Sequence, residues 1–141
     1  MLKNTKEFFK RTKFKVVLFF DKFESFVNNT REKLKNLYQT NYNTGMYHLE
    51  HGNLWDATLR FKIIKKFWPD KLEAQYQYAV CLILQNMNQD ATALLNEMLG
   101  KDQNYIGAKN LLEDLENGRT QKIVEEYKAK FNKENEAKET K

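Results

Sequence analysis

The sequence predicts an all-α protein, in which a long amphipathic helix precedes a short array of about two and a half helical hairpins. The 141 residues include one Pro and five Gly, so few positions interrupt a helix. Apolar residues near the N-terminus recur at helical spacing. A pattern of small and large apolar residues, here called the ladder, begins at Gly45 and is repeated 34 residues later from Ala79. Periods of this length are typical of stacked helical repeats.

The first predicted element is a basic amphipathic helix over residues 1–38. Its apolar residues follow one another at steps that place them in one stripe along a helix. The stripe consists of Phe8, Phe9, Val16, Phe19, Phe20, Phe23, Phe26, Val27, Leu34, Leu37 and Tyr38. Asn29 and Glu32 have the spacing of a capping pair. One long helix therefore fits the pattern, and so do two collinear helices with a break near residues 28–30.

The array is predicted over residues 39–118, and a C-terminal helix over residues 119–141. Turn and cap signals divide the array: Gly52–Asn53 as a turn, Pro69 after a helix, Asp90 as an N-cap and Gly100 as a stop. The predicted helices run over 40–51, 54–67, 70–86, 90–99 and 103–117. The last helix begins amphipathic, and we expect it to fray into a charged tail because the tail has nothing to bury.

The ladder resembles the tetratricopeptide repeat (TPR), a family of stacked helical hairpins. That family places small residues where two helices touch, large apolar residues between them, and Gly at the turn. The matching residues are Gly45, His48, Gly52, Ala57, Phe61 and Pro69 in the first unit, and Ala79, Leu82, Ala91 and Leu95 in the second. Asn86 and Gln103 replace the turn Gly and the Pro of the second unit, and only the first helix of a third unit matches, with Ala108. The resemblance covers about residues 38–117, and it implies that the ladder is scaffold.

The resemblance also implies a binding surface, because the first helix of each TPR unit lines a concave face that binds a peptide or a helix. Carried over to this chain, that face consists of Gln39, Tyr42, Asn43, Met46, Glu50, Glu73, Tyr76, Gln77, Val80, Ile83, Asn110, Leu111 and Asp114. Aromatic, Met and amide side chains with few charges suit an extended peptide or an amphipathic helix. One branch of the family grips the carboxylate of chaperone tails with Lys, Asn and Arg. Those positions here hold Tyr42, Met46, Gln77, Gly107 and Leu111, so the sequence predicts no such grip.

No motif for catalysis or phosphate binding occurs in the sequence. His48 and His51 lie three residues apart, but two ligands do not make a metal site. Cys81 lies in the apolar run 79–84 and is expected to be a buried, inert thiol. The sequence therefore predicts a non-enzymatic protein with no cofactor and no metal.

Positive charge is concentrated at the N-terminus. Residues 1–38 contain ten Lys and Arg against four Asp and Glu, whereas residues 39–118 contain seven against ten. The basic aromatic segment predicts a second surface, which consists of Lys6, Phe9, Lys10, Arg11, Lys13 and Phe20. Three roles remain open for it: packing on the repeats, contact with an anionic membrane, or pairing with a second copy as a homo-oligomer. Nucleic acid is not an expected partner, because no base-stacking module is recognisable.

The sequence contains no apolar run of about 18 residues, the length that a membrane-spanning helix needs. It also contains no cleavage pattern of a secretory signal after Phe20. We therefore expect a cytoplasmic protein, either free or peripheral on a membrane. The leading prediction is an adaptor or scaffold whose repeat face binds another protein through a peptide or helix segment.

Overall fold

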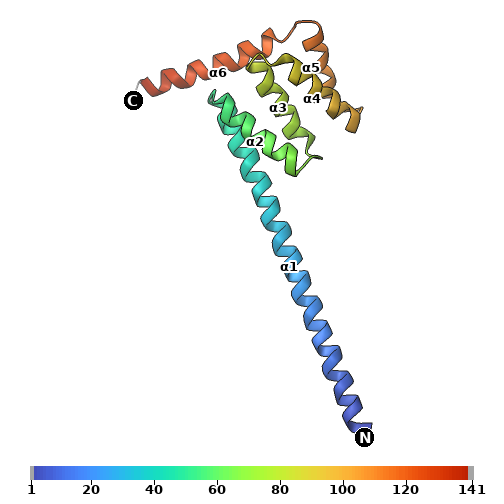
Figure 1. Cartoon of the computed structure of the whole chain (residues 1–141). Coiled ribbons are helices and arrows are strands. Elements are labelled where there is room, and N and C mark those ends of the chain that lie inside the picture. The colour runs from blue at the N-terminus through green and yellow to red at the C-terminus, as the bar shows by residue number, and fades with distance from the viewer. Residues whose placement is uncertain (1, 140–141) are drawn as a thin grey trace. The chain divides into compact units, whose positions relative to one another are not determined.

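A computed structural model describes the backbone of residues 2–139 and the side chains of residues 19, 21–133, 136 and 137. The described residues form six α-helices and no strand, which confirms the all-α prediction. The helices are α1 (Leu2–Glu50), α2 (Leu54–Phe67), α3 (Leu72–Leu84), α4 (Asn88–Lys101), α5 (Ile106–Glu116) and α6 (Gln121–Glu139) (Figure 1). The chain divides into two compact units, residues 1–37 and residues 38–141.

Residues 2–37 of the first unit are one uninterrupted part of α1. The proposed break near residues 28–30 is absent from it, and the Thr30 hydroxyl donates to the Phe26 carbonyl oxygen one turn earlier, at 2.9 Å. The predicted membrane or partner surface is on residues whose side chains lie outside the described part of the chain: Lys6, Phe9, Lys10, Arg11, Lys13 and Phe20.

The predicted helix boundary near residue 40 is also wrong, because α1 continues to Glu50. The residues from Thr40 to Thr44 have weak helix propensity, but tertiary contacts hold them in the helix. The Tyr42 ring meets the Phe61 ring edge-on with centroids 6.0 Å apart. Arg60 Nη1 donates to Asn41 Oδ1 at 3.0 Å. Packing of this kind outweighs local propensity in most protein helices.

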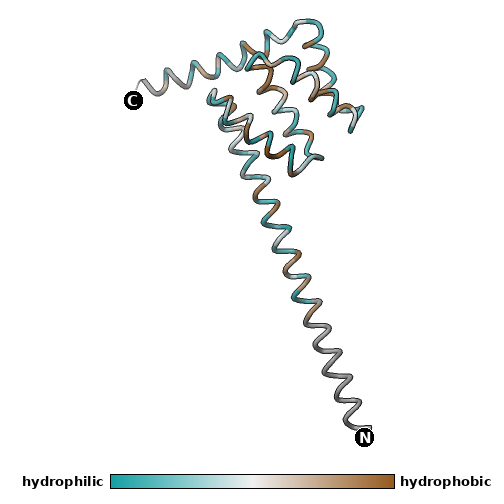
Figure 2. The backbone as a smooth tube through the Cα atoms, viewed as in Figure 1, coloured by the Kyte–Doolittle hydropathy of each residue, from teal (hydrophilic) through white to brown (hydrophobic). Residues whose placement is uncertain are grey.

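The second unit is built around two clusters of buried side chains. One cluster joins the end of α1 to α2 and α3, and it consists of Leu49, Ala57, Phe61, Ile64, Ala74 and Cys81. The other joins α3, α4 and α5, and it consists of Ala79, Val80, Leu82, Ile83, Ala91, Leu94, Leu95, Met98, Ala108 and Leu111. Hydrophobic residues recur along the same helices in Figure 2. The predicted packing role of the ladder residues Ala57, Phe61, Ala79, Leu82, Ala91 and Leu95 is confirmed by their burial.

The hairpin turns depend on residues with a left-handed backbone. Gly52 has a φ of 78° and Asn86, which occupies the equivalent turn, has a φ of 62°. Asn tolerates this conformation better than other residues with a side chain, because its short amide forms local hydrogen bonds. The substitution of Gly by Asn at this position therefore preserves the turn.

Both predicted ends of the helix over 90–99 and the expected fraying of the last helix are wrong. Helix α4 begins at Asn88 with Met87 as its N-cap, so Asp90 lies inside the first turn, where its charge still favours the helix dipole. Gly100 lies within α4, which ends at Lys101. The C-terminal helix α6 also continues to Glu139, past the expected point of fraying, because Glu, Lys and Ala are strong helix formers.

Candidate functional site

The predicted binding residues lie on three helices of the second unit. Helix α1 carries Gln39, Tyr42, Asn43, Met46 and Glu50, α3 carries Glu73, Tyr76, Gln77, Val80 and Ile83, and α5 carries Asn110, Leu111 and Asp114. Helix α3 shares one buried cluster with α1 and the other with α5. The three helices thus form neighbouring parts of one surface.

Three of these positions do not reach the surface. Val80, Ile83 and Leu111 are only 2%, 3% and 2% exposed, and they belong to the core between α3, α4 and α5. A partner cannot contact their side chains in this structure, so we leave them out of the candidate site. The remaining positions are exposed or partly exposed.

A group of tyrosines lies near Glu73 on this surface. The Tyr38 hydroxyl donates to the Glu73 carboxylate, and the Tyr38 and Tyr42 rings lie 6.0 Å apart. The Tyr76 and Tyr105 rings lie 6.3 Å apart on the other side. We call this group the tyrosine face, and it consists of Tyr38, Tyr42, Glu73, Tyr76 and Tyr105.

The hydroxyls of the tyrosine face are neutral donors over the physiological pH range. Burial raises the pKa of Tyr38, and the hydrogen bond and charge of Glu73 raise it further. Burial and the charge of Glu73 likewise raise the pKa values of Tyr42 and Tyr105. The Tyr76 pKa is raised by burial and by the charge of Asp114 instead, so Glu73 acts on three of the four tyrosines.

A shallow cavity of about 330 Å³ adjoins the tyrosine face, and Tyr76, Asp102, Asn104, Tyr105, Ile106 and Gly107 line it. Gly107 has a structural role here, since a Cβ at this position would lie 3.3 Å from both the Tyr76 and the Tyr105 rings. The Ile106 side chain is 70% exposed at the rim. The cavity can therefore receive one apolar side chain of a partner.

Two members of this face were not predicted from the sequence. Tyr38 was assigned to the apolar stripe of the N-terminal helix, and Tyr105 immediately precedes α5, outside the helical positions that the repeat pattern covers. No spacing rule points to Tyr105. Its ring reaches the face because the loop between α4 and α5 carries it toward Tyr76.

Other predicted positions on these helices are polar. The exposed side chains of Gln39 and Asn43 form a hydrogen bond of 2.9 Å with each other. Asp114 accepts a hydrogen bond of 3.1 Å from Arg119 Nε, and Glu113 accepts one of 2.9 Å from Arg119 Nη2. Asp114 is therefore engaged in fixing the turn that follows α5.

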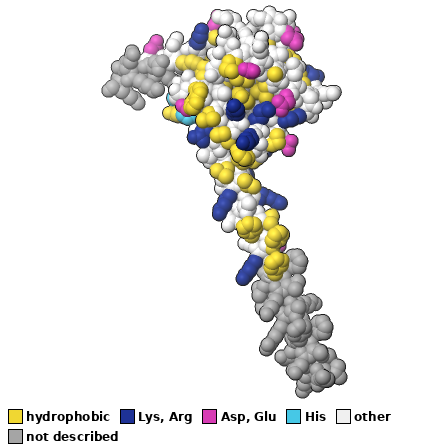
Figure 3. All heavy atoms as spheres, viewed as in Figure 1, with side chains coloured by type: hydrophobic (Ala, Val, Ile, Leu, Met, Phe, Trp, Pro, Cys, Tyr) yellow, Lys and Arg dark blue, Asp and Glu magenta, His cyan; other side chains and the backbone are white. Residues whose placement is uncertain are grey.

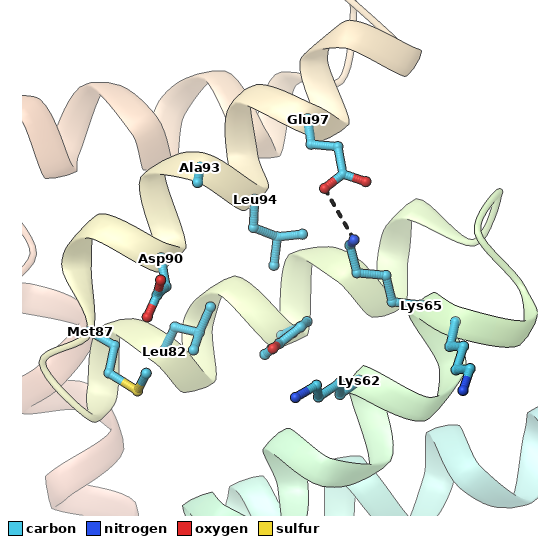
Figure 4. Close-up of a pocket in the computed structure, with 10 residues that line it drawn as sticks. Lys62, Lys65, Leu82, Met87, Asp90, Ala93, Leu94 and Glu97 are labelled. Carbon is cyan, nitrogen blue, oxygen red and sulfur yellow. Dashed lines mark ion pairs between the residues drawn. The ribbon is translucent and has the colours of Figure 1, made fainter.

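A larger groove of about 710 Å³ lies between α2, α3 and α4 (Figure 4). Three lysines of α2, namely Lys62, Lys65 and Lys66, line one side, and Tyr78, Leu82, Met87, Asp90, Ala93, Leu94 and Glu97 line the rest. Figure 4 shows the Lys65–Glu97 ion pair, with Nζ 3.1 Å from Oε2, at one end of the groove. The ion pair connects α2 to α4, which indicates a structural role for these two residues.

His51 makes contacts within its own helix end. His51 Nδ1 lies 2.7 Å from the Tyr47 carbonyl oxygen, and its ring stacks on the Tyr47 ring at 3.9 Å. Among the described residues, no group of three or more His, Cys, Asp or Glu side chains is placed to hold a metal ion. Cys81 is buried, and burial raises the pKa of its thiol to about 12.

Residues 19–37 carry a separate apolar stripe. Phe19, Phe23 and Phe26 are 65%, 56% and 67% exposed, and the Phe19 and Phe23 rings stack with centroids 6.4 Å apart. Figure 3 shows hydrophobic side chains along this segment with Lys and Arg side chains beside them. A single helix cannot bury such a stripe on itself.

Comparisons of the chain with family models, with curated proteins and with solved structures find no match. None of the helices, over the residues described, contains an apolar stretch sufficient to cross a bilayer.

Proposed function

We propose that this chain is a non-enzymatic adaptor that binds a peptide or helix of another protein on the tyrosine face. The observation that carries the proposal is the cluster of four tyrosines around Glu73, next to a cavity of about 330 Å³. Tyrosine provides a large, rigid contact area with a polar tip, and it is enriched at protein interfaces. The cytoplasm is the proposed location.

The chemistry of the face indicates the kind of peptide that it suits. Glu73 and the tyrosine rings attract a Lys or Arg side chain, and Lys71 Nζ already lies 5.0 Å from the centroid of the Tyr38 ring. The cavity beside Tyr105 suits an apolar side chain. A segment with a basic residue close to an apolar residue would use both features.

The TPR-like arrangement is part of this proposal, and the helix boundaries support it. Helices α2 and α4 each contain 14 residues and begin 34 residues apart, at Leu54 and Asn88. Helices α3 and α5 also begin 34 residues apart, at Leu72 and Ile106. The positive φ angles of Gly52 and Asn86 are separated by the same interval. This period is that of TPR hairpins.

The proposal is tested by selecting peptides from a phage-displayed library against the full chain. The selected peptides are then titrated against the wild type, Tyr105→Ala and Glu73→Gln. Loss of a central contact at an interface costs about 1–3 kcal/mol, so we expect affinity to fall at least about fivefold. Tyr47→Ala is the matched control, because Tyr47 is 56% exposed on α1 but takes no part in the tyrosine face. Equal affinity for all four proteins would refute the proposal.

A second candidate function rests on the exposed stripe of Phe19, Phe23 and Phe26. Exposed aromatic residues beside Lys and Arg fit the surface of an anionic membrane. Co-sedimentation with phosphatidylserine vesicles tests it with Phe19→Ala/Phe23→Ala, and with Trp55→Ala as the control for an exposed aromatic residue elsewhere. Salt-sensitive binding that only the Phe variant loses would support membrane attachment. A homodimer that only the Phe variant loses would instead support pairing of two N-terminal helices.

A further inference from the structure

Helix α6 lies against the same group of helices that forms the candidate surface. It packs on α3, whose C-terminal end it passes in Figure 1. Ile123, Val124 and Tyr127 of α6 pack against the buried cluster that contains Val80 and Ile83. Three positions that the TPR resemblance assigns to ligand binding, Val80, Ile83 and Leu111, therefore belong to the cluster on which α6 packs.

Tyr127 and Phe131 extend this contact toward the end of α1. Tyr127 packs against both buried clusters of the unit. A Cβ on Gly52 would lie 3.2 Å from the Phe131 ring, so the turn after α1 accommodates this aromatic ring closely. The Tyr127 and Phe131 rings lie 6.1 Å apart. Helix α6 thus reaches from α3 to the first hairpin.

The contacts of α6 come from one narrow face. Ile123, Val124, Tyr127 and Phe131 fall within about 100° of a helical wheel, the width of an amphipathic stripe. The charged side chains of Glu125, Glu126, Lys128 and Lys130 are exposed. Helix α6 therefore resembles a docked amphipathic peptide, with apolar residues at positions i, i+1, i+4 and i+8.

Helix α6 is also the least anchored of the helices in the second unit. Each of α2, α3, α4 and α5 contributes fully buried side chains. All four contact residues of α6 remain partly exposed, and none of the described side chains in this helix is buried. The turn before α6 contains exposed Gly118, with a φ of 65°. Elements with few buried contacts open at low free-energy cost.

We infer that α6 is an internal ligand, and that the site beneath it accepts an amphipathic helix of another protein with the same i, i+1, i+4, i+8 apolar spacing. The inference rests on the proposed function, because it extends the same binding surface from Glu73 toward Gly52. A partner helix displaces α6 and then continues toward the tyrosine face. The tether gives α6 an effective concentration on the order of millimolar, so the partner must compete with it.

A fluorescein-labelled peptide with the sequence of residues 119–137 tests the inference against the full chain. Fluorescence anisotropy measures its affinity for the wild type, for Tyr127→Ala/Phe131→Ala and for the exposed-face control Lys128→Ala. We expect the double variant to bind the peptide about tenfold more tightly than the wild type, because its own α6 no longer competes. Lys128→Ala is expected to match the wild type. A peptide carrying both Ala substitutions is expected not to bind.

Equal affinity for the wild type and the folded double variant would overturn the inference. Hydrogen exchange on the wild type provides a second measurement that does not depend on a variant. We expect amides of residues 123–131 to exchange at least about tenfold faster than those of α3, through local opening. Protection equal to that of α3 would show that α6 is a fixed part of the fold. The proposed function would survive either failure if library peptides still lose affinity on Tyr105→Ala.

Discussion

Gly45 and Gly100 both lie inside helices, but only Gly100 has room for a methyl group. A Cβ at Gly45 would lie 2.9 Å from Cζ and 3.0 Å from Cε1 of Phe61, and 3.3 Å from Cβ of Arg60. No heavy atom outside the local helix lies within 4 Å of the same position at Gly100. Replacing Gly by Ala at both sites therefore separates the effect of helix propensity on stability from the effect of packing.

The expected magnitudes follow from these distances. Replacing Gly by Ala inside a helix favours folding by about 1 kcal/mol, and by less near a helix end such as Gly100. Phe61 is 0% exposed and its ring meets Tyr42, so it has no space into which it can move. Overpacking of this kind costs about 1–3 kcal/mol. We expect Gly100→Ala to stabilise the chain by about 0.5 kcal/mol, and Gly45→Ala to destabilise it by up to about 2 kcal/mol.

Urea unfolding followed by circular dichroism measures both variants, with unchanged m-values as the check on comparability. A double-mutant cycle with Phe61→Leu identifies the cause, because a smaller side chain should relieve the clash and reduce the cost of Gly45→Ala. If Gly45→Ala stabilised the chain as much as Gly100→Ala, the contact with Phe61 would not limit how closely α1 and α2 approach.

Three further predictions concern stability. Asn86→Ala should destabilise the chain by about 1 kcal/mol because φ is positive at this residue, whereas Asn86→Gly should not. The urea unfolding midpoints of the two variants measure the difference. Equal midpoints would contradict this account. In the same assay, Leu95→Ala should lower the free energy of unfolding by about 2–5 kcal/mol, because Leu95 is fully buried. Leu59 is half-exposed, so Leu59→Ala should lower it by less than about 0.5 kcal/mol. Equal losses for the two variants would show that Leu95 is not a core residue. Because burial raises the pKa of Cys81 from 9.0 to about 12, its contribution to the free energy of unfolding is full below pH 9 and falls as the pH rises from 9 to about 12. In Cys81→Ala the free energy of unfolding should therefore fall less between pH 9 and about pH 12 than in the wild type. Urea unfolding below and above pH 9 measures this difference. An equal fall in both proteins would show that other groups cause it.

Helix α2, the second helix of the first hairpin, shows which features the sequence alone can predict. Residues 54–67 were predicted as a helix from Gly52 and Pro69, and α2 spans Leu54–Phe67. Gly and Pro act through their own backbone geometry, so such boundaries are readable from the sequence. The boundary near Thr40 was misplaced because Phe61 and Arg60, distant in the sequence, hold those residues in α1.

Some residues of the candidate site could also be predicted from the sequence, and others could not. Tyr42 and Tyr76 were named from the TPR resemblance, which implies that the first helix of each hairpin lines one binding face. Val80 and Ile83 were named by the same rule but are buried, because a period specifies position along a helix and not what covers it. Tyr105 and the docking of α6 depend on loop geometry and on contacts across the unit, which no local pattern encodes.

The sequence by itself determined the helical class, the ladder of small residues and the turns, because each depends on the conformational preferences of a few neighbouring residues. Only the tertiary structure decided which of the predicted surface positions are exposed, that Glu73 has tyrosines on both sides, and that α6 packs on α3. These features depend on side chains brought together from distant segments, where burial and close packing outweigh local preference.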